Sequence, residues 1–226
     1  LPSNYLELAL WLESDRMGFL LDALDQTRFD IQREVVKNER RQSYENRPYG
    51  KAYLMLQPEV FPAPHPYNWP TIGSQEDLDN ASLEDVQNFF RKFYVPSNAS
   101  LSIAGDIDFD SAINLVEKTF GNLAPGTPIS RMHNMNSPLS GTTSLVTADN
   151  VQLERIYYTW PTTSAFDKHE PSLDLLAIIL GQGKSSRLHR KLVHDTEIAK
   201  DVSVASYAQE ISGEFIIQAT TSPNKT

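Results

Sequence analysis

The chain has 226 residues, contains no cysteine and carries a formal net charge of −9 at pH 7. With 40% hydrophobic residues it can bury the core of one large or two ordinary domains. The missing cysteine excludes disulfides, thiolate metal sites and cysteine nucleophiles, and the acidic balance argues against general nucleic-acid binding.

A broad apolar stripe at helical spacing predicts a first helix from Asn4 to about Asp25, with Asn4 and Glu7 as its capping pair. The stripe consists of Leu6, Leu10, Met17, Leu20, Leu21 and Leu24. The next stretch, Phe29 to Gly50, is predicted as a second helix. Thr27 and Asp30 would cap its start, and Pro48 would end it.

Glu39 is the most informative residue of this second helix. Gln32, Val35, Val36 and Glu39 recur at helical spacing, so they share one face. A carboxylate buried on a valine-lined face needs an arginine, a hydrogen-bond network or a metal, because an unpaired buried charge is very costly. The alternatives are an ordinary ion pair with a neighbouring arginine (Arg33, Arg40 or Arg41) or a solvated helix face.

The middle of the chain contains a proline-rich stretch and two predicted helices that are marked by N-cap residues and apolar spacing. A short helix is expected around Ala52 to Leu56, followed by an extended loop from Pro58 to Pro70 in which His65 packs or hydrogen-bonds. Further helices are predicted from a Ser82–Asp85 capping box and from Asp108 to Gly121, with a strand from Ser100 to Gly105 between them. The phenylalanine stripe of the first of these helices (Val86, Phe89, Phe90, Phe93) is interpreted as core.

Residues 124–143 are rich in Pro, Gly, Ser, Thr and Asn, and we predict an interdomain linker at 131–143. Strands are expected at Ser144–Thr147 and Val151–Trp160, and a helix is expected to open at Pro171. A further helix capped by Ser185 or Ser186 and two strands, Val202–Gln209 and Glu214–Thr220, complete the predicted elements.

The histidines do not form a recognisable metal motif. None of the five belongs to an HxxEH sequence, and the closest pair, His189 and His194, would be turned about 140° apart on an α-helix. A catalytic zinc needs three protein ligands and an open position. The GQGKSS stretch from Gly181 lacks the first glycine of a phosphate-binding loop, so nucleotide binding is not predicted.

Three collinear stretches resemble the insulinase/pitrilysin-like (M16-type) zinc peptidases of bacteria: QREVVKNERRQSYENRPYG, HPYNWPTIGSQEDLDNASLEDVQNFFRKFYVPSNASLSIAGDID and LLAIILGQGKSSRLHRKLV. In that family an inverted HxxEH helix carries two zinc-binding histidines and the general base. The resemblance implies that Glu39 is the third Zn²⁺ ligand and that Gln32, a neutral hydrogen-bonding group, supports it without binding the metal. It also implies that the general base lies upstream of Leu1. In such an enzyme zinc polarises the scissile carbonyl and activates water.

The same resemblance implies an α+β fold of antiparallel sheets with helices packed mainly on one face, in two related units each only partly present. Residues 1–130 would be the C-terminal half of the first unit, and residues 144–226 the N-terminal half of the second. The implied function is zinc-dependent hydrolysis of peptides or unfolded polypeptides by the parent protein, with this segment inactive alone. The alternative is a non-catalytic homologous partner subunit or a binding domain of such a complex.

The expected partners are a peptide or unfolded polypeptide substrate and a homologous subunit or dimer. Neither nucleic acid nor a membrane span is expected, because basic clusters and long apolar runs are missing from the sequence. A periplasmic or secreted location of the parent is favoured by the lack of cysteine, although location is not fixed by this signal.

Overall fold

The computed structural model describes residues 2–133, 135 and 139–225. The chain forms two compact units, Leu1–Val36 with Gln75–Arg131 and Lys37–Ser74 with Met132–Thr226. Helix α2 (Gln26–Arg40) contributes to both units, since the division falls between Val36 and Lys37. The predicted boundary at residues 131–143 remains a prediction, and residues 134 and 136–138 of that linker lie outside the described residues.

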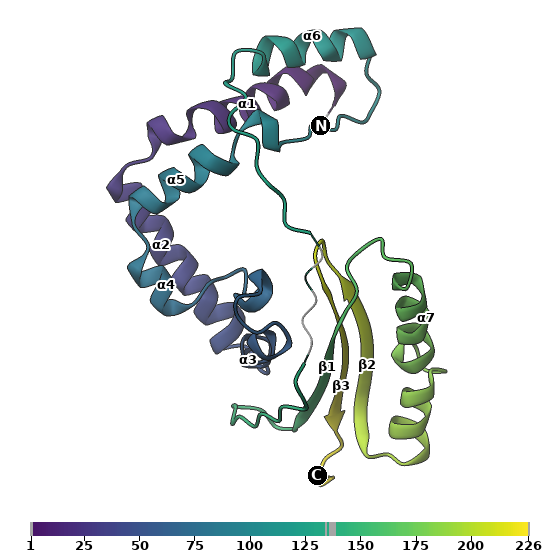
Figure 1. Cartoon of the computed structure of the whole chain (residues 1–226). Coiled ribbons are helices and arrows are strands. Elements are labelled where there is room, and N and C mark those ends of the chain that lie inside the picture. Colours follow the sequence, from purple (N-terminus) through teal and green to yellow (C-terminus); the bar gives the residue numbers. More distant parts are fainter. Residues whose placement is uncertain (1, 134, 136–138, 226) are drawn as a thin grey trace. The chain divides into compact units, whose positions relative to one another are not determined.

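All the regular secondary structure in the described residues of the first unit is helical. Besides the first part of α2, it contains η1 (Ser3–Tyr5), α1 (Leu6–Ala23), α4 (Gln75–Asn80), α5 (Leu83–Phe93), η4 (Pro96–Asn98) and α6 (Phe109–Phe120). Helices α1 and α6 lie side by side (Figure 1). The predicted stripe of α1 is confirmed, because all six of its residues are among the less exposed positions.

Two of the predicted helix starts are wrong, and two are confirmed. Helix α1 follows the short η1 turn and has no side-chain cap, so Asn4 and Glu7 do not cap it. At the start of α2, the carboxylate of Asp25 and not the side chain of Thr27 accepts from the backbone N–H of Arg28, at 2.8 Å. The Ser82–Asp85 capping box is present. The side chain of Asp108 accepts from the backbone N–H of Ser111 at 2.9 Å, so local side-chain caps define α5 and α6.

The strand predicted from Ser100 to Gly105 is not formed, because no strand among the described residues of the first unit is available to pair with it. The phenylalanine stripe of α5 is not a buried core in the described structure either. Phe89 is 54% exposed, although its ring lies 5.0 Å from that of Phe93.

The second unit contains a three-stranded antiparallel sheet in the order β1-β3-β2. Its strands are β1 (Arg155–Thr162), β2 (Ala199–Ala208) and β3 (Gly213–Thr221). The helical elements are the π-helical turns η2 (Arg41–Glu45) and η5 (His189–Asp195), together with α3 (Lys51–Val60), η3 (Pro66–Asn68) and α7 (Glu170–Gly181). The α+β class and the last two predicted strands are therefore confirmed.

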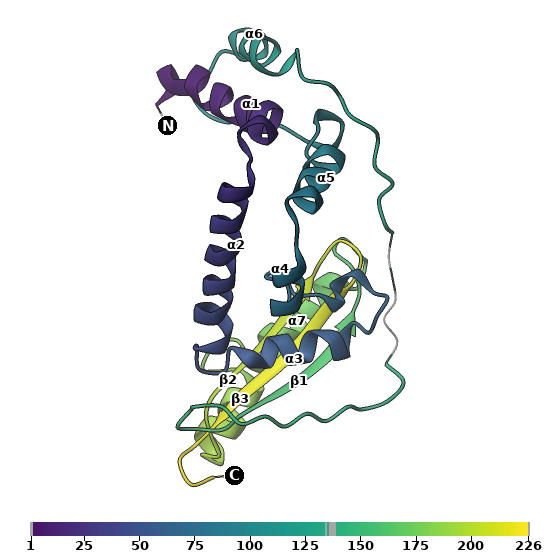
Figure 2. The ribbon, with the colours of Figure 1, turned by 90° about the vertical axis from the view of Figure 1, so that its left-hand side faces the viewer.

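The sheet has a helix against each face, α7 on one side and α3 on the other (Figure 2). Ala177 of α7 packs with Val204 and Phe215 of the sheet as a buried cluster. On the α3 side the ring of Tyr53 meets that of Tyr157 edge-on at 6.0 Å. These contacts make the second unit a layered α+β structure.

Other local predictions differ from the structure. Helix α3 runs through Pro58 to Val60, since proline removes one amide donor but its fixed φ is helical. Residues 144–147 form no strand, and β1 begins at Arg155 rather than at Val151, because Arg155 is where pairing with β3 starts. Among the described residues, no helix combines the length and apolar character needed to cross a membrane.

Candidate functional site

Glu39 lies in the last turn of α2, and its side chain is exposed. Val35, one turn earlier, is 51% exposed, and Gln32 is exposed as well. Of the interpretations offered by the sequence, a solvated helix face agrees with the described structure, and burial on a valine-lined face does not. The carboxylate needs no partner to offset desolvation, since it faces solvent.

The arginines near Glu39 bind other groups. Arg40 donates to Glu45 at 2.7 Å and to the carbonyl of Gly73 at 3.1 Å. Arg33 donates to Asp30 and to the Ala81 carbonyl, and Arg41 donates to the side chain of Asn38. Within the part of the chain that the structure describes, Glu39 forms no salt bridge, so the ion-pair alternative is wrong and its carboxylate is available to another ligand.

A complete zinc site is not formed by the described residues. No group of three or more His, Asp or Glu side chains among them is arranged to hold a metal ion. The one carboxylate of Glu39 does not satisfy the three-ligand requirement of a catalytic zinc. The described residues therefore do not fit a catalytic zinc by themselves.

His65 has a structural role, as predicted. It is only 3% exposed, its ring stacks on Phe61 with centres 4.9 Å apart, and its Nδ1 accepts from the backbone N–H of Tyr67 at 3.0 Å. These contacts order the loop that follows α3.

The prediction that His189 and His194 point apart is wrong. Their ring centres lie 5.1 Å apart, because η5 is a π-helical turn and not an α-helix. Hydrogen bonds that join residues five apart place such residues on the same side of a helix, as in the bond from the Thr196 N–H to the Lys191 carbonyl. Sequence spacing alone gives no sign of this change in helix type.

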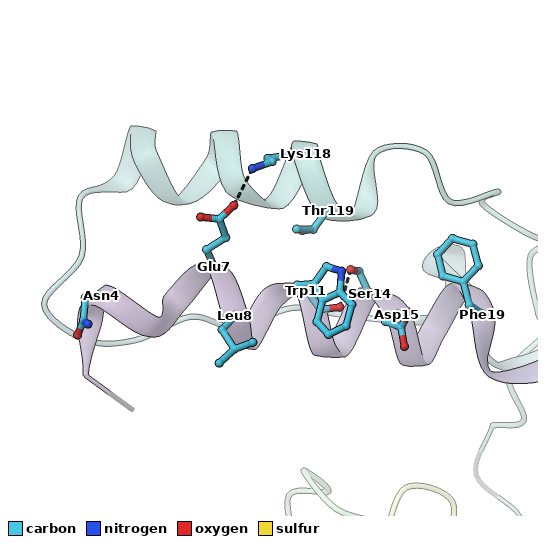
Figure 3. Close-up of a pocket in the computed structure, with 9 residues that line it drawn as sticks. All are labelled: Asn4, Glu7, Leu8, Trp11, Ser14, Asp15, Phe19, Lys118 and Thr119. Atoms are coloured by element: carbon cyan, nitrogen blue, oxygen red, sulfur yellow. Dashed lines mark hydrogen bonds and ion pairs between the residues drawn. The ribbon is translucent and has the colours of Figure 1, made fainter. Parts of the chain in front are cut away.

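A pocket of about 600 Å³ lies in the first unit between α1 and α6. Figure 3 shows its lining: Asn4, Glu7, Leu8, Trp11, Ser14, Asp15, Phe19, Lys118 and Thr119. Glu7 is neutralised there by Lys118, whose Nζ lies 2.6 Å from the carboxylate. Neither Glu39 nor Gln32 lines this pocket.

Glu214 is a half-buried acid that the sequence did not single out. Burial raises the pKa of its carboxyl above the ordinary value of 4.5, while a hydrogen bond from Thr159 acts in the opposite direction. Burial also raises the pKa of Tyr53, and the neighbouring Tyr157 adds to that effect. The position of Glu214 at the start of a predicted strand was its only sequence signal.

Comparison with known proteins shows which family the chain belongs to. The profile described as the peptidase M16 inactive domain matches residues 80–226, more than half of the chain. The curated zinc protease PqqE of Helicobacter pylori is 29% identical over 225 residues, which cover 97% of this chain and 49% of that protein. The chain thus spans about half the length of this relative.

Two solved structures show the same fold. The crystal structure of a protease from Helicobacter pylori matches with a TM-score of 0.83 and 29% identity, over 98% of this chain and 53% of that one. Pitrilysin matches with a TM-score of 0.70 and 16% identity, over 98% of this chain and 24% of that one, a likeness of fold alone. The matched profile and the shared pitrilysin-like fold show that the chain belongs to the M16 peptidase family, as a domain of the inactive type.

Proposed function

We propose that this chain is part of a zinc metalloendopeptidase that hydrolyses peptides or unfolded polypeptides, and that it contributes the carboxylate of Glu39 to the zinc. The other ligands and the general base would come from an HxxEH helix outside these 226 residues. The observation that carries the proposal is the state of Glu39, an exposed carboxylate beside three arginines that each bind another group.

The contacts around Glu39 suit a ligand to a cation. An arginine paired with the carboxylate would have to be displaced before a metal could bind, at a cost of up to about 1 kcal/mol for an exposed ion pair. Arg40 is instead fixed by Glu45 and by the Gly73 carbonyl. Glu39 can therefore present its negative charge without rearrangement of its neighbours.

Gln32 is proposed to support Glu39. It lies seven residues earlier on α2, two turns away along the same face. A neutral amide there can hydrogen-bond and orient a ligating carboxylate, but it adds no charge. We therefore assign it a positioning role and not direct metal ligation.

The alternative function is that of a non-catalytic homologous partner subunit or a binding domain of such a peptidase complex. Two observations favour it: the matching profile is described as an inactive domain, and the described residues contain no three-ligand metal cluster. In either case we propose two related units, 1–130 and 144–226, and association with a second homologous subunit.

The two functions are separated by a comparison of the full-length gene product with the 226-residue chain. We expect the full-length protein to cleave an unstructured fluorogenic peptide, to lose activity with a chelator and to regain it with Zn²⁺, whereas the 226-residue chain stays inactive. A full-length protein that binds the peptide without cleaving it would support the partner function. Chelator-sensitive turnover by the 226-residue chain alone would contradict the proposal.

A further inference from the structure

His189 and His194 are brought together by the π-helical turn η5 of the second unit. Their ring centres are 5.1 Å apart and the ring planes are inclined by 57°. Two imidazoles bound to one ion with tetrahedral geometry, through metal–nitrogen bonds of about 2.1 Å, have ring centres roughly 5 Å apart. The pair is therefore spaced as two ligands of a single ion would be.

The hydrogen bonding of His189 is a second, independent observation. Its Nδ1 is buried, and no hydrogen-bond partner for it is present in the described structure. A buried polar atom without a partner is uncommon, and an ion or an ordered water is a usual explanation. The ring that carries this nitrogen lies beside the ring of His194.

Solvent reaches the pair from the side of His194, because the Nδ1 atom of His189 is covered. His194 is exposed and His189 is half-buried, so one ring is fixed by its surroundings while the other opens to solvent. Leu188, the residue before the turn, packs against the buried cluster of α7 and the sheet, which anchors the start of η5. An ion held there would complete its coordination with water.

We propose that His189 and His194 form a two-histidine surface site for a late first-row divalent ion, Cu²⁺, Ni²⁺ or Zn²⁺. Neutral imidazole is a preferred ligand of these ions, whereas Mg²⁺ and Ca²⁺ require oxygen ligands. Among these ions Cu²⁺ is expected to bind most tightly. The site does not depend on Glu39 or on the proposed peptidase activity.

The test is a titration of the 226-residue chain with Cu²⁺, followed by calorimetry and by the visible copper absorbance. We expect one saturable site, and at least about tenfold weaker binding after His194→Ala, because one of two chelating ligands is lost. His169→Ala is the matched control, since His169 is also exposed but has no histidine neighbour, and it should leave affinity unchanged. Glu39→Gln should likewise have no effect.

A cycle of single and double variants shows whether the two rings act on one ion. Loss of either ring should weaken binding nearly as much as loss of both, because a chelate needs the two together. Circular dichroism verifies folding of His189→Ala, and the exposed His194→Ala supplies the decisive result if that variant unfolds. Unchanged Cu²⁺ affinity in His194→Ala, or additive losses that indicate two independent ions, would overturn the proposal.

Discussion

Arg40 donates from Nη1 to Oε1 of Glu45 at 2.7 Å, across the π-helical turn that continues α2. The pair joins a well-buried guanidinium to a partly exposed carboxylate, since the Arg40 side chain is only 13% exposed. The cation next to Glu39 in sequence is thereby bound to a different acid. Arg40 therefore does not neutralise Glu39, which is consistent with the proposed role of Glu39 as a metal ligand.

Gly181 allows α7 to approach β2 closely. A Cβ added at Gly181 would overlap the Val204 side chain and would lie 2.7 Å from the backbone nitrogen of Val204. We expect Gly181→Ala to destabilise the protein by about 1–3 kcal/mol, because overpacking outweighs the gain in helix propensity of about 0.5–1 kcal/mol. Urea unfolding measures this change.

Gly141→Ala is the matched control, since a Cβ there would meet nothing within 4 Å. Its effect should stay within about 0.5 kcal/mol, as for other surface substitutions. Equal stability of the two alanine variants would mean that α7 does not pack on β2 as described.

Glu214 gives a pH dependence of stability with a defined sign. Its pKa is raised in the folded state, so the folded protein binds more protons than the unfolded chain. Glu214 therefore makes its full contribution to folding stability below the ordinary pKa of 4.5. This contribution is lost as the pH rises through the folded-state pKa. Glu214→Gln, which stays neutral and keeps an acceptor for Thr159, should become more stable relative to the wild type as pH rises.

Thermal unfolding of both proteins between pH 4 and pH 8 gives the difference directly, with Glu59→Gln on an exposed position as the control. A difference that stays constant over this range would show that the Glu214 carboxyl is not desolvated.

The contribution of the α5 capping box to the stability of the protein should be measurable by itself. The Ser82 hydroxyl accepts from the Asp85 N–H at 3.2 Å, and the Asp85 carboxylate accepts from the Ser82 N–H at 2.9 Å. Ser82→Ala should cost about 1 kcal/mol, the usual effect of losing an N-cap. Chemical denaturation monitored by helical circular dichroism would detect it. Ser144→Ala, at an exposed position outside helices and strands, should change nothing.

The linker prediction is tested by limited proteolysis. Residues 131–143 are poor in apolar side chains that could hold them against a core, so a protease of low specificity should cut there first. Mass spectrometry of the early fragments locates the cut. First cleavage inside Ser82–Gly121 would move the boundary.

Elements defined by local signals in the sequence agree better with the structure than elements that depend on distant partners. Helix α6 was predicted at both ends because Asp108, Gly121 and the apolar spacing are local signals. The strand at Ser100–Gly105 failed because a strand depends on a partner that local alternation does not specify. The α5 stripe failed in the same way, since spacing reveals an apolar face but not what covers it.

The candidate sites show the same limit. The resemblance selected Glu39 as a ligand, but its exposure and the partners of its arginines required coordinates. The proximity of His189 and His194 could not be predicted, because angular spacing was calculated for an α-helix and the chain forms a π-helical turn there.

The most direct test of the account compares Glu39→Gln with Gln32→Ala in the full-length protein, with zinc measured after dialysis that removes weakly bound ions. His194→Ala in the same background excludes a contribution from the histidine pair, and circular dichroism verifies folding. Glu39→Gln should lose the zinc and lower the peptidase rate by more than about 100-fold, whereas Gln32→Ala should cost about 10–100-fold, as for a group that only orients a ligand. Normal zinc content and a normal rate in Glu39→Gln would contradict the account, and Glu39 would then be an ordinary solvated carboxylate of α2.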